Sequence, residues 1–417
     1  MDKQTQDPCA TPKGLLSVAD ARARIDALVT AIKGTEQLPI RSALNRILAM
    51  PIISSINVPP NTNSAMDGYA LRGADLPVSG NTRLKVIGRA MAGAPFSGSV
   101  AAGQAVRIMT GAVIPEGADT VLMQEHVTAD GEVIEIGSGH KIGQNVRMAG
   151  EDMAVGSTVL APGKQLLPAE LGVLASLGIA EVRVTRRLRV AFFSTGDELR
   201  SLGEPLEAGQ IYDSNRYTLH GMLSRLGIEI LDLGVIRDDR DAIHQAFKDA
   251  AAIADVVITS GGVSVGEADF VKQTLDEIGK VDFWKIAMKP GKPLAFGTLG
   301  DAVFFGLPGN PVSVMATFYQ FVQPALQKMM GMSAASSLTL KVPCAVELKK
   351  EPGRLEYQRG ILQSDDKGNM TVTTTGRQGS HVLSSMSQSN CFIILPAECA
   401  GVHRGDPVVV QPFAGLI

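Results

Sequence analysis

Between residues 188 and 330 the chain alternates short apolar runs with amphipathic stretches. The two patterns have the periods of a strand and of a helix. They predict strands at 188–193, 229–235, 255–259, 294–297 and 303–305, and helices at 215–226, 239–253, 270–278 and 312–330. Short strands separated by helices favour a mainly parallel sheet covered on both faces. We therefore expect a three-layer α/β/α domain at residues 188–331.

Different patterns flank this block. Residues 15–33 have the period of an amphipathic helix. Residues 54–150 hold short alternating runs divided by Gly, Pro, Asn and Asp, which indicates a β-rich insertion. A predicted strand at 157–159 and a helix at 167–177 follow, so residues 1–53 and 151–187 are expected to form one discontinuous domain. Short strands at 338–342, 370–374, 391–395 and 407–410 predict a small C-terminal β-barrel or sandwich at 332–417.

A glycine-rich turn, DVVITSGGVSVGEAD at residues 255–269, follows one of the buried strands. Bare backbone N–H groups in such a turn bind anions, which makes phosphate the natural ligand. The glycines match neither the Walker pattern nor the dinucleotide fingerprint, so an ordinary strand-to-helix turn is the alternative. The candidate binding residues are Ser260, Gly261, Gly262, Ser264 and Gly266, and Asp269 stands where the next helix begins.

Two more segments follow within the same block. KIAMKPGKP, residues 285–293, brings Lys285, Lys289 and Lys292 close together on a backbone stiffened by two prolines, as capture of an oxyanion requires. Solvated surface lysines are the alternative. GLPGNP, residues 306–311, is a second rigid loop that follows a strand.

Carboxylates also follow the predicted strands. Because ligands bind at the carboxyl ends of strands in open α/β sheets, Glu198, Asp238 and Asp269 are expected to share one region. Several carboxylates beside a phosphate-binding loop suit Mg²⁺. Surface charge is the alternative for Asp238. Asp67, in NSAMDGYA, lies far away in the β-rich segment, where Asp-Gly is a common turn signal.

Composition narrows the classes of function. Lys plus Arg number 39 and Asp plus Glu 42, a net charge of −3, which argues against a nucleic-acid-binding face. The four cysteines form no CxxC pair, so zinc and a disulfide framework are not expected. The GxSxG motif of serine hydrolases is missing, so that chemistry has no support, and the six histidines are scattered without forming a cluster. The chain has neither an apolar leader nor a run of eighteen apolar residues, so we expect a cytoplasmic protein without a membrane span.

Taken together, NSAMDGYA, RIMTGA, STGDEL, TSGGVSVGEADF, FWKIAMKPGKP and GLPGNPVSV resemble, in order and spacing, the MoeA proteins and gephyrin E domains, the molybdopterin molybdenumtransferase family. The resemblance spans nearly the whole chain. It implies that molybdenum from molybdate is inserted into adenylylated molybdopterin with Mg²⁺, and that the adenylate is hydrolysed to AMP. It also implies a homodimer, a molybdopterin-binding α/β domain, and contact with other proteins of the pathway.

The resemblance also assigns roles residue by residue. Asp67, Thr110, Glu198, Asp238 and Asp269 match the family's polar and carboxylate set, with Glu198, Asp238 and Asp269 as metal ligands. Lys285 and Lys289 match the family's anion-contacting lysines. Pro308, Gly309 and Pro311 match the rigid loop beside the molybdate site. Arg359, with Ser384 or Ser385, matches the arginine and serine that bind molybdate. A molybdopterin adenylyltransferase and a pterin-binding scaffold without turnover are the alternative functions.

Overall fold

The structure, a computed structural model, describes residues 14–261, 270–333 and 337–413. By its internal contacts the chain divides into two compact units. The first takes in the chain up to Glu36, residues 45–49 and the chain from Val184 onward; the second takes in residues 37–44 and 50–183. Strands β1 (Thr35–Pro39) and β12 (Glu181–Thr185) pair where the chain passes from one unit to the other and returns. No helix in these ranges is long and apolar enough to cross a membrane.

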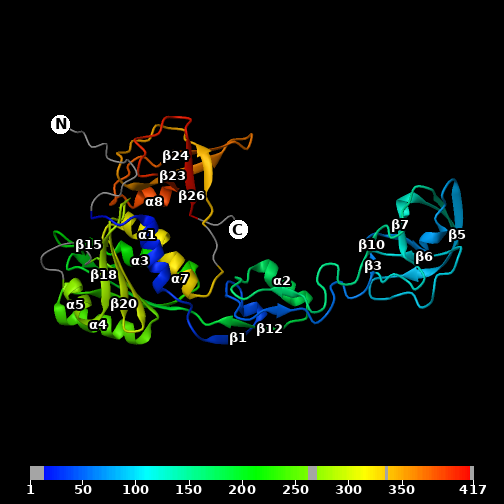
Figure 1. Ribbon diagram of the computed structural model, residues 1–417, viewed down its shortest axis with the longest axis horizontal. Coiled ribbons are helices and arrows are strands. Elements are labelled where there is room, and N and C mark those ends of the chain that lie inside the picture. Colours follow the sequence, from blue (N-terminus) through cyan, green and yellow to red (C-terminus); the bar gives the residue numbers. More distant parts are fainter. Residues whose placement is uncertain (1–13, 262–269, 334–336, 414–417) are drawn as a thin grey trace, which may run out of the picture. The chain divides into compact units, whose positions relative to one another are not determined.

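A six-stranded sheet forms the centre of the α/β layers of the first unit, and its strands β18 and β20 are labelled in Figure 1. The strand order is β16-β13-β17-β21-β20-β18. The first four strands pair in parallel, and the pairings of β21 with β20 and of β20 with β18 are antiparallel, so that β20 alone of the six runs in the opposite direction; this confirms a mainly parallel sheet. Strand β18 was not predicted. The bounds are β13 Arg189–Thr195, β16 Glu229–Ile236, β17 Val256–Ser260, β18 Lys280–Lys285, β20 Pro293–Leu299 and β21 Ala302–Leu307.

Helices cover both faces of this sheet, so the three-layer prediction is confirmed. Alternate residues of β13 point to opposite layers: Phe192 packs in the core with α3 and α6, and Phe193 packs in the core with α4 and α5. Helix α1 also packs in the first of these cores, through Val18, Ala21 and Ile25. The bounds are α1 Val18–Leu28, α3 Ser214–Arg225, α4 Arg240–Ile253, α5 Phe270–Ile278, α6 Pro311–Thr317 and α7 Gln323–Met329.

The predicted helix at 312–330 is interrupted by a π-helical turn, Phe318–Val322, between α6 and α7. Pro324 has no N–H to donate to the carbonyl of Gln320, four residues earlier. That carbonyl instead accepts a hydrogen bond of 3.0 Å from Nε of Arg22 on α1. The irregular turn thus attaches the N-terminal helix to the core.

The C-terminal residues of the first unit build a second six-stranded sheet, curved into a half-barrel. Its order is β19-β23-β25-β26-β22, with β24 beside β23. Strand β19 comes from the lysine-rich segment and pairs in parallel with β23, so this sheet and the α/β layers share a segment of chain. The bounds are β19 Met288–Lys289, β22 Leu340–Pro343, β23 Leu355–Ser364, β24 Met370–Thr374, β25 Cys391–Leu395, β26 Pro407–Pro412 and α8 Ser384–Gln388.

The second unit is β-rich, as predicted. Its main sheet runs β7-β4-β6-β5-β9-β8, with separate apolar clusters around Val106 and around Leu122. The bounds are β4 Gly68–Leu71, β5 Asn81–Ala90, β6 Gln104–Ile108, β7 Thr120–Met123, β8 Val127–Asp130 and β9 Val133–Gly137; smaller elements are β2 Ile52–Ile53, β3 Asn63–Ser64, β10 Val146–Arg147, β11 Thr158–Leu160 and α2 Pro168–Ser176.

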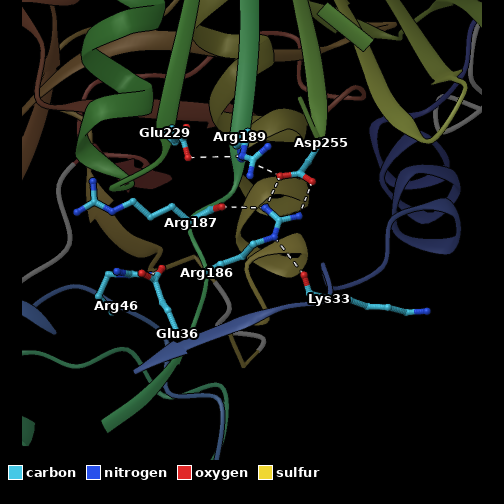
Figure 2. Close-up of polar contacts among 8 residues, drawn as sticks. All are labelled: Lys33, Glu36, Arg46, Arg186, Arg187, Arg189, Glu229 and Asp255. Carbon is cyan, nitrogen blue, oxygen red and sulfur yellow. Dashed lines mark hydrogen bonds and ion pairs between the residues drawn. The ribbon is translucent and has the colours of Figure 1, made fainter. Parts of the chain in front are cut away.

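An ion pair anchors the returning chain to the start of the central sheet (Figure 2). The Arg186 guanidinium donates to both carboxylate oxygens of Asp255, at 2.7 and 2.8 Å, and its Nε donates to the carbonyl of Lys33 at 3.1 Å. Asp255 also accepts the N–H of Arg189 at 2.8 Å. The Arg186 guanidinium therefore joins its own segment to two others that are distant in sequence, those of Lys33 and Asp255.

We predict that Asp255→Asn lowers the free energy of unfolding by about 2 kcal/mol at pH 7, since it removes charged hydrogen bonds from a half-buried site. Burial alone would raise the pKa of Asp255, but the bonds from Arg186 and the Arg189 N–H outweigh burial and lower it. A lowered folded-state pKa gives stability that is present above the unfolded value of about 3.9 and is lost as the pH falls below it.

Urea unfolding at pH 7 and near pH 3 measures this difference, which should shrink at the lower pH. Glu229→Gln is the matched control, because Glu229 pairs with Arg189 at 3.6 Å on the same edge and its side chain is 51% exposed. Exposed pairs contribute little, so the control should cost under about 1 kcal/mol. Equal losses in the two variants would contradict the special role of Asp255.

Candidate functional site

Polar residues gather at the carboxyl ends of β13, β17 and β21. The parallel register aligns Ser194 with Ser260, and Ser260 with Leu307, so these strands end at the same level. Asn215, at the start of α3, donates to Ser260 Oγ at 2.9 Å and to the Gly309 carbonyl at 2.7 Å. One amide thus joins the predicted Ser260 and Gly309 across two strand ends.

Gly261 occupies a position that requires glycine. Its φ of +93° is in the left-handed region, and a Cβ there would lie 2.7 Å from the Thr195 carbonyl. The close approach brings the start of the glycine-rich turn against the end of β13. Gly262, Ser264, Gly266 and Asp269 lie outside the described residues, so their assignments stay predictions.

The sequence reasoning missed Asp213 and Asn215. Asp213 caps α3 by accepting the Arg216 N–H, and it is only 3% exposed. Asp213 Oδ2 and Asn215 Oδ1 are buried and have no hydrogen-bond partner in the described part of the chain. Buried polar atoms are normally paired, so these two point to polar recognition at this site. The signal was available as Asp-Ser-Asn after a short strand.

Asp197 and Glu198, just after β13, lie near Asp238, just after β16; within the described residues no three His, Cys, Asp or Glu side chains are grouped so that they could hold a metal ion. The Asp238 N–H donates to Asp197 Oδ1 at 3.3 Å. Burial raises the pKa of Asp238, and the negative charges of Asp197 and Glu198 raise it further. The structure therefore brings together the predicted Glu198 and Asp238. Asp239 instead caps α4, accepting the Ala242 N–H at 2.9 Å.

A cavity of about 340 Å³ lies between the lysine-rich segment, the start of α6 and the C-terminal sheet. Three cationic side chains contribute to its wall: Lys289, Lys292 and Arg354. The polar residues Asn310, Ser313 and Ser380 complete it. The predicted lysines 289 and 292 are thus brought together, whereas Lys285 ends β18 and does not line the cavity. Pro308 and Pro311 flank the loop that supplies Asn310.

Arg359 lies behind this wall and is 1% exposed. Its Nε donates to Ser385 Oγ at 3.0 Å, and an Nη donates to the Gly379 carbonyl at 3.0 Å. Of the two predicted serines, Ser385 is the buried partner, while Ser384 is exposed at the start of α8. Burial lowers the pKa of Arg359 to about 10. Since Gly379 lines the cavity, the arginine supports the wall directly.

In the second unit, Asp67 and Thr110 form one pair. Asp67 Oδ1 accepts both the N–H and the hydroxyl of Thr110, each at 2.7 Å. The backbone and then the side-chain hydrogen bond lower the pKa of Asp67, and the positive charge of Arg107 adds to the effect. Arg107 also lies over the Tyr69 ring, 5.1 Å from its centre. Asp67 is therefore held as a carboxylate.

Three family models match the chain in succession. The MoeA N-terminal region (domain I and II) matches residues 16–178, a probable molybdopterin binding domain matches 191–328, and the MoeA C-terminal region (domain IV) matches 341–413.

Known proteins resemble the chain over almost its full length. The molybdopterin molybdenumtransferase of Haemophilus influenzae is 48% identical over 97% of this chain and 100% of its own length. The Bacillus subtilis protein of that name is 34% identical over 90% of this chain and 89% of its own. A crystal structure of the molybdopterin biosynthesis moeA protein from Pyrococcus horikoshii has a TM-score of 0.83 and 30% identity, and covers 96% of this chain and all of its own.

The carboxylate cluster generates a direct prediction. Glu198→Gln removes one of the two negative charges beside Asp238, so the pKa of Asp238 should fall toward its ordinary value near 3.9. A ¹³C NMR titration of labelled aspartate carboxyls, assigned with Asp238→Asn, measures the change. Glu181→Gln, at an exposed position of β12, serves as the charge-matched control. An unmoved Asp238 titration would show that Glu198 lies too far away to act on it.

Proposed function

Because the chain belongs to the MoeA family of molybdopterin molybdenumtransferases, we propose that it transfers molybdenum to molybdopterin in molybdenum cofactor biosynthesis. Full-length similarity to named transferases supports the activity. Among the features of this chain itself, the basic cavity of about 340 Å³ is the main support for the proposal. It holds cations and small polar groups, as a tetrahedral oxyanion such as molybdate needs.

The substrates in this proposal are molybdate and adenylylated molybdopterin, and the adenylate leaves as AMP. Lys289, Lys292 and Arg354 neutralise the charge of the oxyanion, while Asn310 and Ser380 donate or accept hydrogen bonds at its rim. Arg359 and Ser385 hold the wall formed by residues 378–380. The strand ends around Ser260, Asn215 and Gly309 recognise the pterin phosphate.

Mg²⁺ is part of the proposal because the family resemblance implies it. Among the described residues no group of three or more His, Cys, Asp or Glu side chains could hold a metal ion, so Glu198 and Asp238 would need a further ligand. Burial raises the pKa of Asp238, and the negative charges of Asp197 and Glu198 raise it further; a hard cation with oxygen ligands would offset those charges. Glu198 and Asp238 would hold the ion, together with Asp269 from outside the described residues. When bound, Mg²⁺ polarises the phosphoanhydride.

We also propose that the protein acts in the cytoplasm as a homodimer, works with other proteins of the pathway, and has domain boundaries near residues 53, 150, 187 and 331. The family likeness supports each point. Light scattering tests the homodimer, with an expected mass of twice 43.9 kDa.

We predict that the purified protein releases AMP from adenylylated molybdopterin in the presence of molybdate and Mg²⁺. Glu198→Gln should slow AMP release by at least about a hundredfold, because a lost transition-state contact costs several kcal/mol. Chelation with EDTA should have a similar effect, and Mg²⁺ should reverse it. Glu181→Gln should retain full activity. Wild-type protein that binds both substrates without forming AMP would contradict the proposed reaction.

For the cavity, we predict that Lys289→Ala weakens molybdate binding about tenfold at low ionic strength, which corresponds to about 1.4 kcal/mol. Its side chain is 51% exposed, so salt should screen the contact and reduce the difference. Calorimetric titrations with molybdate at two salt concentrations measure both effects. Lys341→Ala, an exposed lysine of β22, is the control. Equal affinity of wild type and Lys289→Ala at low salt would remove Lys289 from the site.

A further inference from the structure

Glu356 is a buried carboxylate in contact with one of the cavity's cations. Strand β19 pairs in parallel with β23 so that Lys289 lies directly opposite Glu356. Lys289 Nζ is 3.1 Å from Glu356 Oε1, and the two side chains are 51% and 6% exposed. The register of the two strands therefore places a buried anion beside a half-exposed cation that also lines the cavity.

The carboxylate has other support besides Lys289. Glu356 Oε2 accepts a hydrogen bond of 3.1 Å from Gln358 Nε2. Lys350 lies nearby and donates to the carbonyls of Ala397 and Cys399. Burial lowers the pKa of Lys350, and the negative charge of Glu356 opposes that shift, so the two groups interact. Glu356 therefore keeps a hydrogen bond from Gln358 and a nearby cation, Lys350, when the Lys289 ammonium turns away.

We propose that Glu356 competes with the incoming oxyanion for Lys289 and so limits the affinity of the cavity for oxyanions. The inference rests on the oxyanion cavity of the proposed function. Without a bound oxyanion, the Glu356 carboxylate pairs with the Lys289 ammonium. An oxyanion can contact Lys289 only by drawing the ammonium away from Glu356. Lys292 and Arg354, the other cations of the wall, supply the attraction that overcomes this competition.

The competition weakens binding of every tetrahedral dianion that enters. Any such ion, molybdate or sulfate, must gain enough from Lys292, Arg354 and the polar wall to displace a carboxylate already in place. Glu356 therefore keeps the cavity free of weakly held oxyanions. A residue that merely fixed Lys289 in place would have the opposite effect, because its loss would weaken binding.

The test is calorimetric titration with sodium molybdate and sodium sulfate at low ionic strength. Glu356→Gln keeps the size of the side chain and removes its charge, so it should tighten the binding of both ions by about fivefold or more. In a Lys289→Ala background the same substitution should change affinity by less than about twofold, since the cation for which the anions compete is gone. Glu347→Gln, an exposed glutamate of the same C-terminal region, is the charge-matched control and should leave affinity unchanged.

A second variant should change oxyanion affinity in the opposite direction. Gln358→Met removes the hydrogen bond to Oε2, so Glu356 depends more on Lys289, and oxyanion binding should weaken. Thermal unfolding of each variant verifies that it is folded. Tighter oxyanion binding in Glu356→Gln together with weaker binding in Gln358→Met supports the competition. If Glu356→Gln binds oxyanions as weakly as wild type or more weakly, while Lys289→Ala still binds them more weakly than wild type, the competition is contradicted but the oxyanion cavity is not. If the wild-type protein binds neither ion, or if Lys289→Ala binds both ions as wild type does, the proposed role of the cavity as an oxyanion site is contradicted as well.

Discussion

The parallel register of β13, β17 and β21 is the constraint on which the site depends. Each residue of β17 and β21 is buried, because helices cover both faces of the sheet. A slip of one residue would exchange the side chains of the two cores, so packing fixes the register. The register in turn brings Ser194, Ser260 and Leu307 to one level, and the loops that follow them begin there.

At the opposite end of strand β17, an ion pair holds the chain in place. Asp255 stands just before β17, and Arg186 joins it to the segment that returns from the second unit and to the Lys33 carbonyl (Figure 2). Both ends of β17 thus have a defined role: one holds the connecting chain in place and the other presents the start of the glycine-rich turn. Apolar packing between them makes the strand rigid.

Charges in the candidate site are arranged in two separate groups. Carboxylates at the ends of β13 and β16 repel one another, which favours a cation, while the cavity beside β19 collects lysines and an arginine, which favours an anion. Glu356 moderates the second group and Arg359 supports its wall without lining it. This separation matches the function proposed above, in which the carboxylates hold Mg²⁺ and the cavity holds the oxyanion.

The sequence by itself determined the α/β layers, the β-rich segment and the residues of the glycine- and lysine-rich loops, because periodicity and turn chemistry are local properties. It did not reveal β23, since the strand buries Glu356, Gln358 and Arg359 where an apolar pattern is expected. The tertiary structure decided that Ser385 rather than Ser384 meets Arg359, that Asn215 joins Ser260 to Gly309, and that Lys289 lies opposite Glu356. Those contacts join residues far apart in the chain, and strand register and packing determine them.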